Sequence, residues 1–419
     1  MTGTKHTGHP AVSWVPTLYL AEALPYTAVM VISVIMYKDL GLRDGQIAFY
    51  TSWLSLPWVV KPVWSSIVDN LRTKRWWILT MQYFLGCALA LVAFSLQTHW
   101  WLQLSLALFM LVAFSSATHD ISADGFYILA LDEQEQSAFV GIRNTFYRVG
   151  MLVGQGALVL LVGFLAFNEM RMSWAIAFGV LAGIMLLLAL SHTLTLPRGM
   201  EEERHQRFFL RQQLAELVET LKCLLTKPHL TSALAFILLF RLPEGMLAKM
   251  VPLFMKTAQT EGGLGMSNVE VGFVNGTLGV IGLLAGGIVG GLLVARYGLK
   301  RCLWPLVLCF TLPDLVYLFL SLHTDANLAV ISACVSVEQF GYGMGFAAYT
   351  LFLIGFSRGE RATAIFSICT AGQFLGGAVL PGMVSGWISD SVGYVTFFSI
   401  VMVLCLVTFA VTAAVRIRE

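Results

Sequence analysis

Charged side chains are scarce in this chain. Asp, Glu, Lys and Arg make up 12% of its 419 residues, whereas a soluble domain carries about 25%. Apolar residues reach 57% and the mean hydropathy is +0.76. This composition excludes a soluble globular domain and predicts a protein that crosses a lipid bilayer many times. The net charge of only +2 also leaves no basic surface for nucleic acid.

Motifs for metal binding, redox chemistry and hydrolysis are missing as well. The seven cysteines show no CxxC or Cys/His spacing, and most lie within apolar runs, which predicts small core residues rather than ligands. Neither HExxH nor GxSxG occurs, so we expect no enzymatic activity, no metal and no cofactor. Residues 1–10 are polar and are followed directly by a full-length apolar run, so no cleavable signal is evident.

Apolar runs, separated by charged residues, glycine or proline, divide the chain into twelve predicted membrane spans. A helix needs about 20 apolar residues to cross the hydrocarbon core, and the runs are of that length. The sequence therefore predicts an all-α membrane protein with twelve transmembrane helices. The predicted spans are 14–37, 46–69, 76–97, 101–131, 139–165, 172–195, 229–256, 268–294, 302–322, 326–356, 362–388 and 393–415.

Lys and Arg are unevenly distributed between the two sets of connecting segments. If the N-terminus is cytoplasmic, seventeen of them fall on the cytoplasmic side and four on the outside. Such a bias places both termini in the cytoplasm. The one long polar connection, 198–228, keeps apolar residues at helical spacing, which predicts an amphipathic linker helix on the cytoplasmic surface. It separates two six-helix halves, 1–197 and 229–419.

The two halves resemble each other at an offset of about 224 residues. Gly41-Leu-Arg-Asp44 opens the second span and Gly265-Met-Ser-Asn268 opens the eighth. A parallel repeat of this kind is typical of major facilitator transporters. The loop after the eighth span, 291–301, also resembles the loop signature of that superfamily.

The loops that end the second and eighth spans are candidates for a cytoplasmic gate, because cations there can bind helix C-termini and carboxylates in one state only. Anchoring by the positive-inside rule alone is the alternative. Ala295 stands where the first copy has an acid, so we expect an asymmetric gate. The candidate gating residues are Asp69, Arg72, Arg75, Arg296 and Arg301.

Ionisable residues inside the predicted spans are the main functional candidates, since a charge at the bilayer centre costs at least ~2.5 kcal/mol. Asp120 and Asp124 are spaced i,i+4 and share one helix face. We expect Arg148, at a similar depth in the next span, to pair with Asp120. That pairing leaves Glu22 or Asp124 free to exchange protons. The alternative is a permanent Asp120–Arg148 pair that only holds two helices together.

The C-terminal half carries a matching set of buried charges. Arg241 and Glu244 are spaced i,i+3 and can pair on one helix face, while Pro243 bends the span. An Arg at such a bend suits an anionic or carbonyl-rich substrate. Glu338 occupies the repeat position of Asp120, which favours a functional role.

Other residues in the spans allow more than one interpretation. Lys61 can extend to the cytoplasmic surface or serve the interior, and Asp314 is expected to pair across helices. His119 can relay a proton or simply pack. Trp58 is expected to face lipid or to pack at the interface, with stacking on a sugar as the alternative.

Several of these segments resemble the muropeptide permease (AmpG-like) family, which belongs to a wider peptide and acetyl-coenzyme A transporter group of the major facilitator superfamily. The resemblance implies a proton-driven importer of the inner membrane that carries anhydro-sugar peptides from cell-wall turnover. The segments are Lys61-Pro-Val-Trp-Ser65 with Asp69, Ser115-Ser-Ala-Thr-His-Asp120 with Asp124, Tyr147-Arg-Val-Gly-Met-Leu-Val153, Val274-Asn-Gly-Thr-Leu-Gly279 and Glu338-Gln-Phe-Gly-Tyr-Gly-Met-Gly345.

The family's functional positions carry over by motif to Asp120, Asp124, Arg148 and Glu338. Arg241 and Glu244 stand where the family tends to show Lys and Asp, and Glu22 replaces a small residue. We therefore expect Glu22, Asp120, Asp124 and Glu338 to handle protons, and Arg148, Arg241 and Glu244 to bind the substrate.

The expected protein is a monomer whose partners are a small-molecule substrate, protons and the lipid bilayer. The alternative is a major facilitator transporter of another cargo, such as a siderophore, an acyl-coenzyme A-like anion or an exported drug.

Overall fold

The computed structural model describes residues 10–165, 169–198, 210–359 and 361–415, and within them it contains helices and no strand. The predicted all-α fold is confirmed. The N-terminal half consists of α1 Val15–Thr27, α2 Ser33–Asp39, α3 Asp44–Trp53, α4 Leu56–Leu71, α5 Lys74–Ser95, α6 Trp101–Ala130, α7 Glu133–Met151, α8 Val159–Leu165 and α9 Met170–Thr195.

After the linker helix α10, the C-terminal half repeats the same plan. Its helices are α11 Leu230–Leu239, α12 Leu242–Lys256, α13 Asn268–Phe273, α14 Val280–Tyr297, α15 Leu299–Thr311, α16 Leu315–Leu322, α17 Leu328–Ser357, α18 Ala362–Phe374 and α19 Leu380–Ala414. Short 3₁₀ turns occur at η1 Ala11–Ser13, η4 Gln259–Glu261 and η6 Leu312–Asp314.

Ten helical stretches in the described chain are long and apolar enough to cross a membrane by length and composition. One of them, 362–414, contains two predicted spans, because the chain turns at Gly393 with φ 77°. The second predicted span consists of α3 and α4, which are interrupted where Pro57 begins the new helix without a backbone N–H. With these two additions the helices match the twelve predicted spans.

Four spans contain a π-helical stretch, in which the backbone makes a wider turn than an α-helix. Such stretches are rare and often mark functional sites. They are η2 Ala28–Ile32, η3 Leu152–Leu158, η5 Val274–Gly279 and η7 Leu375–Val379. Two of them, η3 and η5, pack against each other across the halves, where Gly156 and Gly276 allow the backbones to approach closely.

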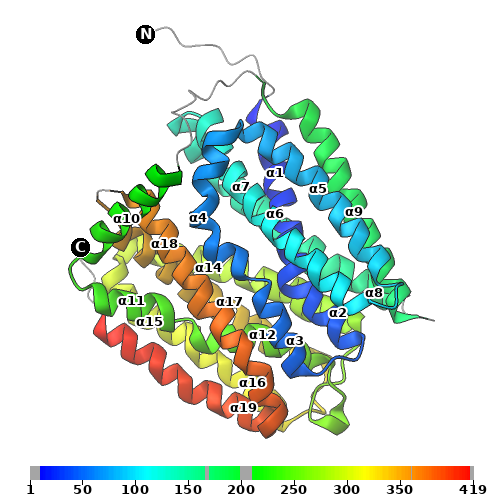
Figure 1. The fold of residues 1–419 in the computed structure, drawn as a ribbon. Helices are drawn as coiled ribbons and strands as arrows, with labels where there is room; N and C mark the ends of the chain where they lie inside the picture. The colour runs from blue at the N-terminus through cyan, green and yellow to red at the C-terminus, as the bar shows by residue number, and fades with distance from the viewer. Residues whose placement is uncertain (1–9, 166–168, 199–209, 360, 416–419) are drawn as a thin grey trace, which may run out of the picture.

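Figure 1 shows the two halves side by side, with α10 and the C-terminal end of α19 toward one end of the molecule. We call this the linker end. At the opposite end, the loop end, the connections 40–43 and 257–267 meet the turn at Gly393. There α3 packs on α19, α2 on α12, and α8 on α13. The halves are therefore held together at the loop end, and α4 also packs on α18 across the halves.

Buried apolar side chains hold the two halves together at the loop end. One continuous cluster takes Ile35 and Met36 from α2 together with Met250 and Phe254 from α12, each no more than 1% exposed. A second cluster, around Phe240 and Phe310, lies within the C-terminal half and includes Leu224 of the linker helix. The apolar core thus joins the halves at the loop end and separates from there toward the linker end.

The linker helix α10, Leu210–Leu225, lies against the C-terminal half. Arg361 donates to Thr220 Oγ1 at 3.4 Å, and Lys227 donates to the carbonyls of Phe356 and Arg358. On its exposed face, the Lys222 ammonium 2.8 Å from Glu219 lowers the pKa of that carboxyl.

Candidate functional site

A cavity of about 670 Å³ lies between the two halves. It extends as far as Thr363, in the first turn of α18 near the linker end. Every residue predicted to bind substrate or to exchange protons lines this cavity. From the N-terminal half these are Glu22, Asp120, Asp124 and Arg148, and from the C-terminal half Arg241, Glu244 and Glu338.

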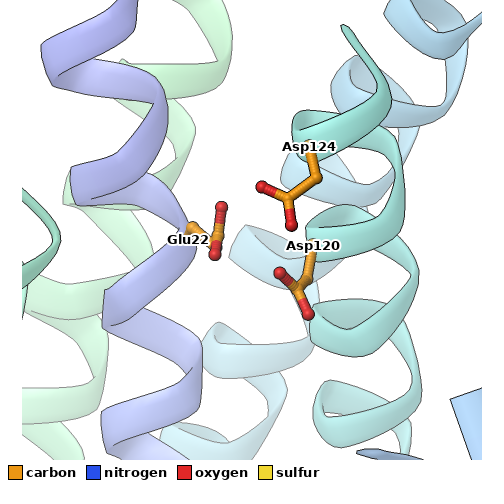
Figure 2. A group of neighbouring side chains, drawn as sticks. All are labelled: Glu22, Asp120 and Asp124. Carbon is orange, nitrogen blue, oxygen red and sulfur yellow. The ribbon is translucent and has the colours of Figure 1, made fainter. Parts of the chain in front are cut away.

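Three carboxylates of the N-terminal half point toward one another. Figure 2 shows Glu22 on α1 facing Asp120 and Asp124 on α6. One oxygen of each lies within 4.8 Å of the others. Asp120 and Asp124 share a helix face as their spacing predicts, and we call the three residues the N-terminal acid cluster.

Cations from two neighbouring helices pair with this cluster. Lys61 of α4 forms an ion pair with Asp120, and Arg143 of α7 pairs with Asp124 at 2.6 Å. The Arg143 guanidinium also lies over the ring of Tyr19, 4.4 Å from its centroid, while the Tyr19 hydroxyl donates to Asp124 at 3.2 Å. The structure thus assigns Lys61 to the interior rather than to the surface.

The predicted Asp120–Arg148 pair is wrong. Arg143 and Arg148 are five residues apart on α7, so they point about 140° apart around the helix axis. Arg143 faces α6, whereas Arg148 faces the cavity, where its Nη1 lies 3.2 Å from Met151 Sδ. Among the described residues Arg148 has no carboxylate partner.

Glu22 is the acid of this cluster that no cation holds within the described chain. Its side chain is 7% exposed, and Glu22 Oε2 has no hydrogen-bond partner there. The cluster therefore combines three carboxyl groups with two cations, Lys61 and Arg143. Fully ionised, it would carry one uncompensated negative charge in an apolar environment.

The predicted Arg241–Glu244 pair does not form either. At Arg241 the backbone leaves the helix with φ −96° and ψ 12°, because Pro243 starts α12 there, so the i,i+3 geometry is lost. Its guanidinium instead donates to the Tyr342 hydroxyl at 2.7 Å and lies over the Phe346 ring, 5.1 Å from the centroid. Arg241 Nε is buried without a partner among described groups.

Glu244 and Glu338 lie together on the other side of the cavity, with Asp314 as a third acid. One oxygen of each lies within 4.8 Å of the others. We call these the C-terminal acid cluster. Asp314 was expected to pair across helices, and it does meet side chains of other helices, but these are acids and the Cys405 thiol. Either cluster could hold a metal ion by proximity alone, but the N-terminal oxygens are already engaged by Lys61 and Arg143.

The sequence did not place any aromatic residue in the cavity wall. Trp58 is 6% exposed and lines the cavity, where it stacks on Phe374 of the other half with centroids 6.3 Å apart. Tyr26 contacts both Trp58 and Tyr147. The expectation that Trp58 faces lipid is wrong, because its side chain lies in the cavity wall. The sequence could not show this, since an aromatic residue in an apolar span can face either lipid or the protein interior.

His119 packs within the N-terminal half. It is fully buried and bonds to Gln82, which also bonds to His192. His192 in turn reaches Thr17, so this chain joins α1, α5, α6 and α9. The amide of Gln82 in the middle favours the packing interpretation.

The predicted gating residues are not brought together across the halves in the described part of the structure. Arg75 donates to the carbonyls of Thr193 and Leu196 within its own half, at 2.8 and 3.3 Å. Arg72 lies over Trp76, Arg296 over Tyr297, and Arg301 is exposed. The side chain of Asp69 lies outside the described residues.

Polar contacts that do join the halves occur at the loop end. Asp39 accepts from Lys256 at 2.8 Å and from Asn268 at 2.6 Å, both in the other half. Asp44 is bonded by Tyr394, and the N–H of Gly45 donates to Asp390 at 2.9 Å. Together with the apolar cluster, these bonds close the cavity on that side.

The family and the fold are shown by comparison with known proteins. The family model described as Major Facilitator Superfamily matches residues 17–381. The crystal structure of a D-xylose-proton symporter superposes with a TM-score of 0.72 at 13% identity, covering 97% of this chain and 99% of that chain. At that identity the likeness shows the fold alone.

Two bacterial transporters are similar to this chain over most of its sequence. The anhydromuropeptide permease of Escherichia coli (strain K12) is 27% identical over 357 residues, which cover 83% of this chain and 68% of the permease. The putative transporter AmpG 4 of Rickettsia conorii (strain ATCC VR-613 / Malish 7) is 22% identical over 403 residues, covering 93% and 92%.

Proposed function

Because the chain belongs to the Major Facilitator Superfamily, we propose that this transporter imports a muropeptide-like anhydro-sugar peptide across the inner membrane, together with protons, by alternating access. The observation that carries the proposal is the cavity between the halves. Two arginines line it, and neither has a carboxylate partner among the described residues. The N-terminal acid cluster lines the same cavity and contains three acids but only two paired cations. Similarity to the anhydromuropeptide permease supports the choice of cargo.

Arg148 and Arg241 are the proposed binding groups for the substrate's negative charge. They reach the cavity from opposite halves. A guanidinium binds a carboxylate through two parallel hydrogen bonds, and a peptide ends in a carboxylate. The aromatic wall formed by Tyr26, Trp58 and Tyr147 offers flat apolar faces for a sugar ring. Glu244 is placed to accept from hydroxyl or amide groups of the same molecule.

Proton coupling is proposed for Glu22, Asp120, Asp124 and Glu338. In the N-terminal acid cluster Lys61 and Arg143 neutralise two carboxylates, so one proton completes the neutralisation. Glu22 is the natural carrier of that proton, since its Oε2 has no described partner and the side chain lines the cavity. Deprotonation restores a negative charge next to an anionic substrate and thereby favours its release.

The linker end is proposed to face the cytoplasm, as the distribution of Lys and Arg predicts. With the loop end sealed, the described conformation is then inward-facing. In the outward-facing state the cavity closes at the linker end, where Asp69, Arg72, Arg75, Arg296 and Arg301 are the proposed gate. A single chain contains both halves and the whole cavity, which suits a monomer.

Uptake in proteoliposomes tests this proposal. The purified protein is reconstituted and supplied with radiolabelled anhydromuropeptide, with an inward proton gradient and after the gradient is dissipated by a protonophore. We expect saturable uptake that the gradient accelerates and that unlabelled muropeptide competes away. Absence of muropeptide uptake rejects the cargo, and uptake indifferent to the gradient rejects the coupling.

A different cargo remains the second candidate, because the cavity offers both cationic and acidic walls. A panel of siderophores, acyl-coenzyme A-like anions and cationic drugs, added in thermal-shift measurements, separates the candidates. Stabilisation by anions alone would assign the site to Arg148 and Arg241, whereas stabilisation by cationic drugs alone would assign it to Glu22 and reverse the expected direction of transport.

A further inference from the structure

The C-terminal acid cluster contains three carboxyl groups from three elements. Glu244 comes from α12, Asp314 from η6 and Glu338 from α17, and their side chains are 4%, 2% and 2% exposed. One oxygen of each lies within 4.8 Å of the others. Three negative charges so close together in an apolar interior repel each other strongly. At least some of this charge must therefore be neutralised.

The neighbouring charged groups do not provide that neutralisation. In the N-terminal half, Lys61 and Arg143 form ion pairs with the acids. No such pair reaches the C-terminal cluster among the described residues. Arg241, three residues before Glu244, donates to Tyr342, and Lys249 donates to the Thr51 carbonyl and hydroxyl of the other half.

The hydrogen bonds around the cluster distinguish its members. Glu338 Oε2 accepts from the Tyr317 hydroxyl of α16 at 2.6 Å and from Gln339 Nε2 at 3.0 Å. Two donors to one oxygen favour the ionised form of that carboxyl group. Glu244 Oε2 and Asp314 Oδ1, in contrast, are buried and have no partner in the described chain. An O–H on each can donate to a neighbouring carboxylate oxygen.

A metal ion fits this arrangement poorly. Hard cations such as Ca²⁺ and Mg²⁺ take about six or more oxygen ligands. Here Glu338 Oε2 already accepts from two donors, and Asp314 Oδ2 accepts from the Cys405 thiol of α19 at 3.7 Å. Of the six carboxylate oxygens, four accept no hydrogen bond from the described residues, which is fewer than such a shell takes. Two of these four, Glu244 Oε2 and Asp314 Oδ1, are also buried, and one proton on each leaves the cluster with a single negative charge.

We propose that Glu244, Asp314 and Glu338 form a second proton site, in which Glu244 and Asp314 carry one proton each and Glu338 carries the negative charge. The site deepens the proposed proton coupling and rests on it for its role in transport. Glu244 lines the cavity beside Arg241, so its O–H can release a proton to cavity water. The proton on Asp314 then passes to the Glu244 carboxylate, which makes Asp314 the inner store.

Infrared difference spectroscopy on the full chain in lipid tests the proposal without any substrate. The C=O stretch of a protonated carboxyl group is measured at neutral pH in wild type, Glu244→Gln and Asp314→Asn. We expect each variant to lose the band of one protonated carboxyl group. Asp39→Asn is the matched control: its carboxylate is buried but paired with Lys256, so no such band should be lost. Unchanged bands in both cluster variants would overturn the proposal.

Radiolabelled Na⁺ and Ca²⁺ provide the second measurement. We expect wild type and Glu244→Gln to bind these ions equally. If wild type binds an ion and Glu244→Gln does not, the cluster is a metal site and the proton assignment is overturned. If a variant fails to fold, the band of Glu22→Gln decides, because this variant lacks the proton proposed for the N-terminal acid cluster. Its remaining band should fall in two steps as the pH is raised, since the second proton leaves a more negative cluster. Absence of the band would overturn the proposal. A failure of muropeptide uptake rejects the proposed cargo but leaves these spectra unaffected, so the two proposals fail separately.

Discussion

Lys61 of α4 and Asp120 of α6 form an ion pair on the cavity wall, where their side chains are 25% and 19% exposed. Because Asp120 also belongs to the N-terminal acid cluster, the pair connects the packing of α4 on α6 with the charge of that cluster. Removal of one partner of a buried pair costs about 3–5 kcal/mol, an upper limit for this half-buried one. Removal of both partners costs far less, because no charge is left unpaired.

Replacement of Asp120 should therefore affect transport and protein yield differently. Asp120→Asn should lower muropeptide uptake at least about tenfold while membrane insertion and expression stay at wild-type levels. Uptake and protein yield are measured together. The control is Glu261→Gln, an exposed acid at the loop end, which should transport normally. An Asp120→Asn protein that fails to insert would instead support a packing role.

The double change Lys61→Gln with Asp120→Asn separates charge from function. We expect its thermal stability to exceed that of Lys61→Gln alone, because the single variant leaves the Asp120 carboxylate without its cation. Transport should remain low, since Asp120, one of the acids proposed for proton coupling, is absent. Equal stability of the single and double variants would mean that Lys61 contributes little to holding Asp120.

The two arginines of the cavity should respond alike to conservative replacement. Arg148→Lys and Arg241→Lys keep the charge but lose the planar pair of donors, so the KM for substrate should rise about tenfold each, equivalent to about 1.4 kcal/mol of binding. Concentration-dependent uptake measures this. Arg171→Lys, at an exposed position outside the cavity, is the matched control. An unchanged KM in both cavity variants contradicts direct recognition of a carboxylate.

The pair of Asp39 with Lys256 should control the loop end. In Asp39→Asn the Lys256 ammonium loses its anion, which weakens the sealed state by on the order of 3 kcal/mol. Spin labels at Arg43 and Glu261, in a background without native cysteines, then report a longer distance by electron paramagnetic resonance. Glu270→Gln, on an exposed helix start of the same end, should leave the distance distribution unchanged.

The glycine contact between the halves gives a steric test. A Cβ at Gly276 would lie 2.6 Å from the Cα of Gly156, so Gly276→Ala should push the halves apart, lower the Tm and reduce uptake. Gly291→Ala in the same span meets nothing within 4 Å and should behave as wild type. Equal effects of the two variants would show that helix propensity, rather than the contact, is responsible.

Depth in the membrane could be predicted from the sequence, because apolar runs place each ionisable residue at a countable distance from the span ends. That is why all seven predicted residues line one cavity. Rotation about each helix axis could not be predicted, since it depends on which neighbour packs on which face. The predicted pairing of Arg148 with Asp120 therefore failed, because Arg143 is the arginine of α7 that faces the acids on α6.

Contacts between segments that are distant in the sequence could not be predicted either. Asp314 meets Glu244 only because η6 interrupts a span at Pro313 next to α12, and no local spacing indicates that meeting. At Arg241 the sequence did contain a signal of the helix break, because helices usually end at or before the residue that precedes a proline, here Pro243. The i,i+3 rule should not have been applied across that break.

The four π-helical stretches affect how this molecule changes shape. A wide turn breaks the regular ladder of hydrogen bonds, so a helix resists bending less there than along a regular α-helical segment. In spans one, five, eight and eleven these compliant points sit near the cavity, whereas α5 and α9 are continuous α-helices. The elastic cost of reorienting the halves is thus distributed over four bends beside the substrate, and the outer helices keep their shape against the lipid.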